Sequence, residues 1–235
     1  MAIINIAVLA VFALFFLSGF YKGFIWNLSA LGASIIALIL AFALRGSVSK
    51  AIVKNGTLYE AMLNYTEGAE AIYERELVDM EITSLTNDQI DEIMERSGLP
   101  FPLRDRVYEN IMDEALKDQG ITTLGDYFNE SMVLTFINIV SFMLIYFVCR
   151  VILTFIICWL DYSIQFSRLR RLDSIVGGAI GLVRGFIDIS VVFMVIPIVL
   201  TVLPFDQIEE LITASAMASF LHRSNIFLKL LPGTI

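Results

Sequence analysis

Long apolar runs separated by polar segments are the main pattern of this chain. A helix that crosses a lipid bilayer needs about 17 to 25 predominantly apolar residues. Four segments have this character: Ala2 to Leu17, Phe24 to Leu44, Met132 to Leu160 and Ile175 to Leu203. The first reaches a spanning length if it extends to Tyr21. The pattern therefore predicts an all-α integral membrane protein with four transmembrane helices.

The polar segments divide the predicted protein into four regions. Residues 1–44 form a transmembrane hairpin, because the turn at 18–23 is short, and residues 132–203 form a second hairpin. Residues 45–131 form a helical insertion outside the membrane between them. Residues 204–235 form an amphipathic helical tail, which begins at Pro204 and is expected in the membrane interface.

Local signals give detail within these regions. A capping box at Thr86–Gln89 starts a helix that ends near Gly98, and a second helix runs from Pro102 to Gly120. An earlier helix is expected from Leu58 to about Val78. These helices pack as a small bundle or lie on the membrane surface, and both arrangements stay open. Pro197 predicts a kink or an end in the fourth span.

Composition agrees with a membrane protein. Apolar residues make up 57% of the chain and charged residues 17%, with a mean hydropathy of +0.77. The net charge of −8 is concentrated between Glu60 and Glu130, where acidic residues far outnumber basic ones. An acidic surface repels nucleic acid, so we expect no nucleic-acid partner. The acidity is interpreted as a solubilising surface, with a site for a cation or a basic partner as the alternative.

Small residues recur at every fourth position in the fourth span, at Gly177, Gly181 and Gly185. At 100° per residue, they lie on one face of the helix together with Arg184 and Asp188. Small-xxx-small patterns let helix backbones approach closely. The sequence therefore predicts a close helix contact, whose partner is the third span or another copy of the chain.

Three charges lie inside the predicted spans: Arg150, Arg184 and Asp188. A lone charge near the middle of a bilayer costs at least about 2.5 to 3.5 kcal/mol, so each is expected to have a partner. Asp188 can pair with Arg184 within one helix, with Arg150 across an interface, or with both. The network is interpreted as structural, with an ion or solute path and lipid head-group binding as alternatives.

Catalytic and metal-binding patterns are absent from the sequence. It contains no His-Glu-x-x-His, Gly-x-Ser-x-Gly, P-loop, dinucleotide or calcium-loop motif. Its single histidine, His222, cannot by itself supply a metal site or a catalytic triad. We therefore expect no enzymatic activity, no cofactor and no metal.

Two motifs resemble the colicin V production protein family. Residues 19–25 (GFYKGFI) and 28–32 (LSALG) are similar to the start of that family, and residues 172–177 (LDSIVG) to a later signature. The likeness in the two loops rests on Gly19, Lys22, Gly23, Phe24 and Asp173, and it continues through Gly181, Arg184 and Gly185. The chain differs in having Lys22 for an arginine, Trp26-Asn27 for Arg-Glu, Ser174 for an arginine, and a longer outer loop.

The resemblance implies a bacterial inner-membrane protein. It implies a role in toxin or peptide production and export, or in envelope homeostasis, with the bilayer and an export or envelope protein as partners. Two alternatives stay open: a small oligomeric channel or transporter that uses the three intramembrane charges, and a scaffold that recruits a partner through its acidic outer domain.

Basic residues in the short loops predict the orientation. Lys22 lies in the loop 18–23, and Arg168, Arg170 and Arg171 lie in the loop 161–174. Because Lys and Arg are enriched in cytoplasmic loops, both loops are expected in the cytoplasm. Both termini and the insertion 45–131 are then expected outside.

Overall fold

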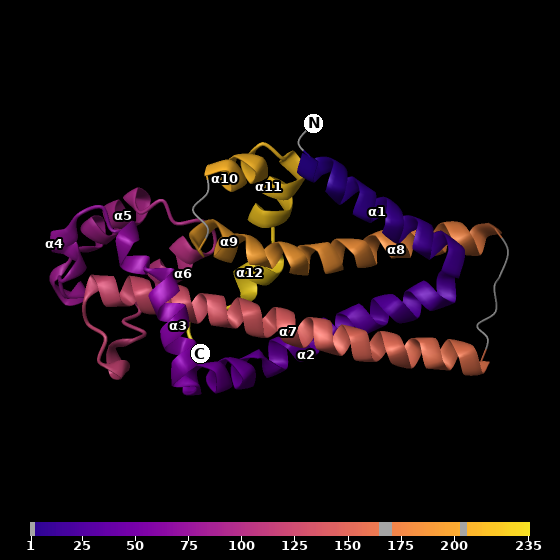
Figure 1. Cartoon of the computed structure of the whole chain (residues 1–235), viewed down its shortest axis with the longest axis horizontal. Coiled ribbons are helices and arrows are strands. Elements are labelled where there is room, and N and C mark those ends of the chain that lie inside the picture. Colours follow the sequence, from indigo (N-terminus) through magenta and orange to yellow (C-terminus); the bar gives the residue numbers. More distant parts are fainter. Residues whose placement is uncertain (1–2, 165–170, 203–205) are drawn as a thin grey trace. The chain divides into compact units, whose positions relative to one another are not determined.

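The computed structural model describes residues 3–164, 171–202 and 206–235 (Figure 1). Within these ranges the chain forms α-helices and short 3-10 helices. An isolated antiparallel β-bridge joins Glu81 and Thr123. The predicted all-α class is confirmed.

Helices long and apolar enough to cross a membrane occur four times in the described ranges, which confirms the predicted number of spans. They are α1 (Ile3–Lys22), α2 (Phe24–Lys54), α7 (Leu124–Ile164) and α8 (Arg171–Val192), which continues through η4 (Phe193–Val195) into α9 (Ile196–Val202). α2 runs to Lys54 instead of ending near Leu44, and α7 begins at Leu124 instead of Met132. Hydropathy shows which part of a helix is apolar but not where the helix ends. The polar residues that extend α2 after Leu44 and α7 before Met132 were therefore not predicted.

The predicted break at Pro197 is confirmed. α8 ends at Val192, a 3-10 turn follows, and α9 restarts at Ile196. Proline lacks a backbone N–H, and its ring clashes with the carbonyl four residues earlier, which here belongs to Phe193. A continuous α-helix through this point is therefore disfavoured.

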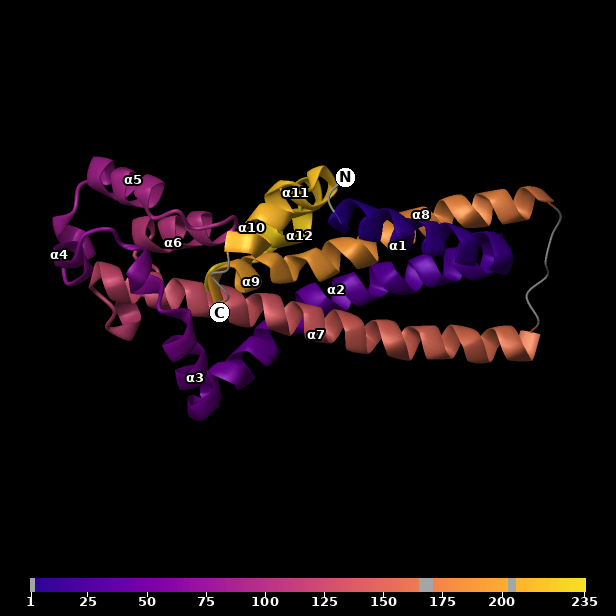
Figure 2. The same ribbon diagram turned by 45° about the horizontal axis from the view of Figure 1, so that its top comes forward.

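The chain divides into two compact units. Unit 1 comprises Met1–Arg45, Phe142–Met194 and Asp206–Asn225, and unit 2 comprises Gly46–Ser141, Val195–Phe205 and Ile226–Ile235. In unit 1, α1 lies along α8, as Figure 1 and Figure 2 both show.

The tail is divided into α10 (Asp206–Thr213), α11 (Ala216–Arg223) and α12 (Ile226–Leu230) rather than forming one amphipathic helix. Ser215 caps α11 by accepting a hydrogen bond from the Ala218 backbone N–H, 3.2 Å. The Ser215 hydroxyl also donates to Asn5 Oδ1, 2.6 Å, and Leu221 packs with Val8 and other apolar residues. α11 thus packs on α1 within unit 1. Pro204, where the tail was predicted to begin, lies outside the described residues.

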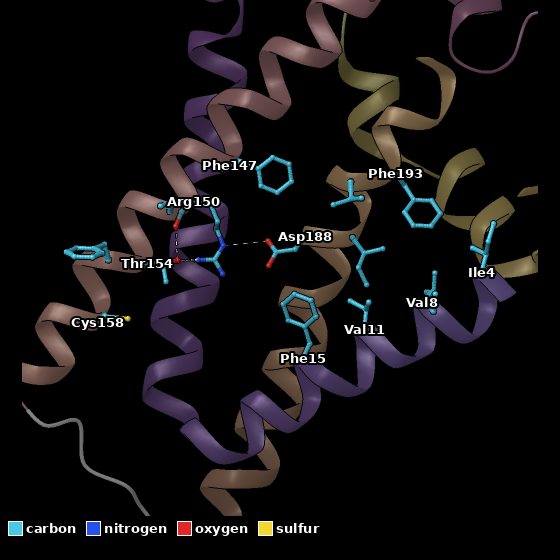
Figure 3. A pocket seen from close by; sticks show the side chains of 15 residues that line it. Ile4, Val8, Val11, Phe15, Phe147, Arg150, Thr154, Cys158, Asp188 and Phe193 are labelled. Atoms are coloured by element: carbon cyan, nitrogen blue, oxygen red, sulfur yellow. Dashed lines mark hydrogen bonds and ion pairs between the residues drawn. The ribbon is translucent and has the colours of Figure 1, made fainter. Parts of the chain in front are cut away.

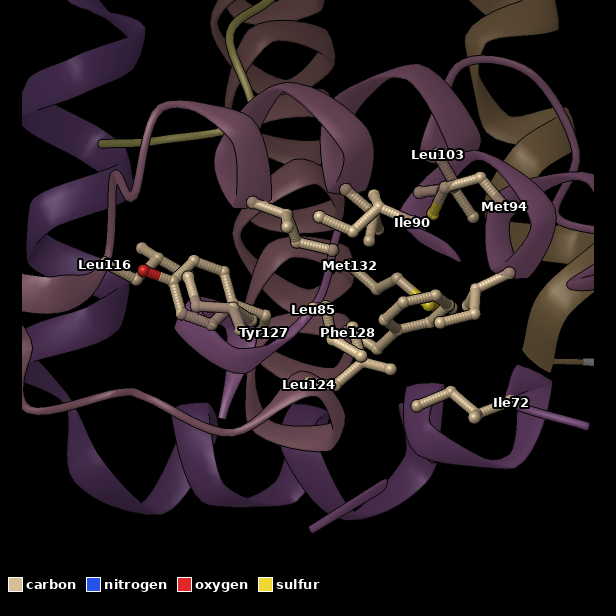
Figure 4. Packing of buried hydrophobic residues seen from close by; sticks show 14 of the residues in the cluster. Ile72, Leu85, Ile90, Met94, Leu103, Leu116, Leu124, Tyr127, Phe128 and Met132 are labelled. Atoms are coloured by element: carbon tan, nitrogen blue, oxygen red, sulfur yellow. The ribbon is translucent and has the colours of Figure 1, made fainter. Parts of the chain in front are cut away.

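Unit 2 has its own apolar core. Phe128 and Met132 of α7 are fully buried and pack with side chains from the short helices of the insertion, among them Ile90 and Leu103 (Figure 4). The surrounding elements are α3 (Gly56–Thr66), η1 (Gly68–Ala71), α4 (Arg75–Val78), η2 (Ile82–Ser84), α5 (Asn87–Arg96), α6 (Leu103–Met112) and η3 (Lys117–Gln119). The insertion is therefore a packed helical bundle.

The helix signals in the insertion had mixed outcomes. The capping box of Thr86 and Gln89 is present and starts α5. The continuous helix expected from Leu58 to Val78 is wrong, because Glu67 adopts a left-handed conformation with φ of 40° and ends α3. Gly68 then packs so closely that a Cβ would lie 2.9 Å from the Phe128 carbonyl oxygen. The second predicted helix is shorter than expected and ends at Met112.

The last residues of the chain are held inside unit 2 by buried amides. Asn138 Nδ2 donates to the carbonyl oxygens of Pro232, 3.0 Å, and Thr234, 3.1 Å. Its Oδ1 accepts from the Ser49 hydroxyl, 3.0 Å. Asn110 Nδ2 donates to the Gly233 carbonyl oxygen, 3.1 Å. These bonds satisfy carbonyl groups of a non-helical segment, which has no intrahelical donors.

Candidate functional site

The predicted glycine face makes a close helix contact, and its partner is α1. A Cβ on Gly177 would lie 2.6 Å from the Gly19 carbonyl oxygen, and one on Gly181 would lie 2.5 Å from the Phe15 carbonyl oxygen. A Cβ on Gly185 would lie 2.7 Å from the Phe15 ring. The expectation of the third span or a second copy as partner is therefore wrong. Gly19, a small residue of the first family-like motif, lies against Gly177 and could have indicated α1 as the partner.

The residues of the two family-like loops lie together at the end of this contact. Gly23 separates α1 from α2 and has a φ of 79°, a region that favours glycine. The Asp173 carboxylate accepts a hydrogen bond from the Phe24 backbone N–H, 2.9 Å, and so satisfies one of the unpaired donors at the start of α2. Lys22 lies over the Trp26 ring, with Nζ 3.6 Å from the ring centroid.

Asn27 is a part of this turn that the sequence analysis missed. It is fully buried, and its Nδ2 donates to the carbonyl oxygens of Gly19, 3.0 Å, and Gly23, 2.7 Å. Gly19 lies near the end of α1 and Gly23 in the turn that follows, and each carbonyl also accepts a backbone N–H, from Gly23 and Asn27 respectively. The sequence feature that could have indicated this role is an amide side chain within an apolar span. Asn27 stands where the family pattern commonly has a glutamate.

Two of the three predicted charges pair across helices. Arg150 Nε on α7 lies 3.6 Å from Asp188 Oδ1 on α8, and the Tyr146 hydroxyl donates a hydrogen bond to the same oxygen. Arg150 Nη1 also donates to the Thr154 hydroxyl, 2.7 Å. Asp188 therefore has a cation and a hydrogen-bond donor, as a carboxylate within a membrane span requires.

Arg184 occupies a different environment. Its guanidinium carbon lies 5.0 Å from the centroid of the Phe15 ring and 5.4 Å from that of the Trp26 ring. The residue is 6% exposed, and within the described part of the chain its Nε and Nη1 have no hydrogen-bond partner. Aromatic faces stabilise a cation electrostatically but accept no N–H hydrogen bond of ordinary strength. Arg184 is therefore held by rings rather than paired with Asp188 one turn away.

The Arg150–Asp188 pair forms the polar part of an otherwise apolar cavity of about 770 Å³ in unit 1 (Figure 3). Its walls come from α1, with Val11 and Phe15, from α7, with Phe147, and from the α8 side, with Phe193. Figure 3 shows the Arg150 and Asp188 side chains pointing toward each other across this space. A cavity of this size lies within the range of about 300–1,000 Å³ that is typical of ligand sites.

Groups for metal or acid–base chemistry are sparse in this cavity. The described residues include no cluster of three or more His, Cys, Asp or Glu side chains that could hold a metal ion. His222 lies apart from the lining, on α11, where burial lowers its pKa to about 4 and the neighbouring Arg223 adds to the effect. The cavity presents apolar walls and one ion pair.

Four apolar spans within the described residues and a partly buried charge pair define a multi-pass helical membrane protein. A family model described as Colicin V production protein matches residues 118–225, so this part of the chain is similar to that family. The match includes α7, α8 and the residues that line most of the cavity, whereas the first motif, at 19–32, lies outside it. No curated protein and no solved structure matches the chain.

Proposed function

We propose that this protein is a non-enzymatic component of the bacterial inner membrane that assists the production or export of a peptide toxin, or maintains the envelope. The observation that carries the proposal is the cavity of unit 1, in which apolar walls surround one neutralised charge pair. Such a site suits binding within the membrane. The family match supports the connection with toxin production.

The channel alternative receives less support from the same residues. Conduction requires a polar path or a charge that is free to interact with ions. Asp188 is engaged by Arg150 and Tyr146, and Arg184 is covered by the Phe15 and Trp26 rings. The scaffold alternative uses the acidic residues of unit 2 and requires no cavity.

A complementation assay tests the three functions. The host is a strain that secretes a colicin V-type peptide and lacks this protein, and the readouts are secreted peptide and detergent sensitivity of the envelope. Val151→Trp fills the cavity, because Val151 lines it. Ile152 is exposed to a similar degree, 54% against 67% for Val151, but is not among the lining residues. We expect Val151→Trp to lose most of the activity and Ile152→Trp, the matched control, to keep it.

Two results would contradict the proposal. Full activity of Val151→Trp, together with loss of activity when residues 60–130 are deleted, favours the scaffold. Ion flux through the purified protein in liposomes, abolished by Asp188→Asn with the fold intact, favours the channel.

A further inference from the structure

We propose that the cavity of unit 1 receives one face of a transmembrane helix from a different protein, and that this helix carries a carboxylate near the middle of the bilayer. The inference rests on the proposed function, because it names the partner class for the same cavity. Its three supports are the surplus of buried donors, their depth, and the distribution of acidic residues in this chain.

Buried cationic donors exceed the acceptors at this level of unit 1. Arg150 and Arg184 carry two positive charges, and Asp188 carries one negative charge. Arg150 Nε makes no hydrogen bond within the described residues, and the same holds for Arg184 Nε and Nη1. Arg150 lines the cavity and Arg184 does not, so an acceptor that enters the cavity can reach the Arg150 guanidinium.

The depth of these groups indicates the source of the acceptor. α1 has 20 residues and is therefore about 30 Å long, the thickness of the hydrocarbon layer. Gly185 lies against Phe15, and Ile189 packs with Val8, so Asp188 lies near the middle of α1. Lipid head groups lie about 15 Å from this level. A span of a protein can place a polar side chain there.

The cavity is open on one side. Among its lining residues, Val151 is 67% exposed and Phe155 is 77% exposed. A spanning helix of about 10 Å diameter and 30 Å length occupies roughly 2,400 Å³, about three times the cavity volume of 770 Å³. The cavity therefore accommodates the side chains of one helix face rather than a whole helix.

The sequence argues against a second copy of this chain as the partner. Residues 1–59 contain no Asp or Glu, so α1 and α2 offer no carboxylate. Asp188 is already engaged by Arg150 and Tyr146. A lipid acyl chain would match the apolar walls but would offer no hydrogen-bond acceptor to Arg150.

Synthetic transmembrane peptides test the inference. The whole protein is reconstituted in liposomes with a fluorescent label, and energy transfer is measured to Leu/Ala peptides whose central residue is Glu, Gln, Lys or Leu. We expect the Glu peptide to bind about tenfold more tightly than the Leu peptide, with Gln between them and Lys weakest. Arg150→Gln is expected to remove the preference of Glu over Leu.

Controls separate the outcomes. Val151→Trp should weaken binding of the Glu peptide, and Ile152→Trp should not, with the unfolding temperature confirming that each variant is folded. Equal binding of all four peptides, displacement of peptide by lipid alone, or energy transfer between copies of the protein in place of peptide binding would each overturn the inference. Absence of a Glu preference, combined with lost secretion in Val151→Trp, rejects this inference and leaves the proposed function standing.

Discussion

Asp173 joins two parts of unit 1 that are far apart in the sequence. Its carboxylate accepts the hydrogen bond of the Phe24 N–H at the first turn of α2, although 149 residues separate them. Side-chain acceptors at this position are worth about 0.5–2 kcal/mol in other helices. The role of Asp173 could not be derived from its own neighbourhood, because the helix that it caps begins elsewhere in the chain.

Asp173→Ala should therefore lower the free energy of unfolding by about 0.5–2 kcal/mol, because the Phe24 N–H loses its acceptor. Asp173→Asn retains a side-chain oxygen and should recover part of this loss. Thermal unfolding in detergent measures both effects. Equal unfolding temperatures for Asp173→Ala and the unchanged protein would show that the cap contributes no stability.

His222 should make the stability depend on pH. Burial lowers its pKa to about 4, below the ordinary value of about 6.5, so between these values the unfolded chain binds more protons than the folded one. The contribution of His222 is complete above pH 6.5 and is lost as the pH falls toward 4. The unfolding temperature should drop more between pH 7.5 and 5 in the unchanged protein than in His222→Gln. Parallel curves would contradict this prediction.

At the scale of helices, the glycine face illustrates both the reach and the limit of the sequence. Its spacing predicts close packing, and the contacts of Gly177, Gly181 and Gly185 with α1 have that character. The partner could not be predicted, because α1 contributes only one glycine to the contact. Its closest contacts with Gly177 and Gly181 are made by backbone carbonyls, which every residue has and which a sequence pattern therefore cannot distinguish. The acceptors of the Asn27 side chain could not be predicted either, because they too are backbone carbonyls.

Gly181→Leu should separate α1 from α8, because a Cβ at this position would meet the Phe15 carbonyl oxygen. Overpacking of this kind costs about 1–3 kcal/mol or more. Gly32→Leu is the matched control, since a Cβ on Gly32 has no atom within 4 Å among those described. Thermal unfolding in detergent and gel filtration report the difference. Unchanged stability and assembly of Gly181→Leu would refute the tight contact.

At the scale of the whole molecule, the number of spans and the helical insertion were predictable, and their boundaries were less so. Apolar runs identify the parts of α2 and α7 that suit a membrane, but both helices continue into polar sequence that unit 2 incorporates. Ser49 lies in the extension of α2 and is fully buried, and its hydroxyl donates to Asn138, a buried polar residue within the predicted third span. The pairing of residues distant in sequence decided these boundaries.

The orientation in the membrane remains a prediction, which cysteine accessibility can measure. Part of the basic loop, residues 165–170, lies outside the described residues. With Cys149 and Cys158 replaced by serine, cysteines at Lys22 and Ser174 should react from the cytoplasm and one at Asn87 from outside, because basic short loops remain inside. Labelling of Ser174→Cys by an impermeant reagent in intact cells would reverse the proposed topology.

The bond between Phe24 and Asp173 also has a consequence for biosynthesis. The first two spans leave the ribosome well before residue 173 has been translated, and at about 5–20 residues per second the interval of 149 residues takes roughly 7–30 s. During this interval the turn at Gly23 lacks both its cap and the glycine surface of α8. The amino-terminal hairpin therefore enters the membrane early, and its turn acquires its final contacts only when the fourth span has been inserted.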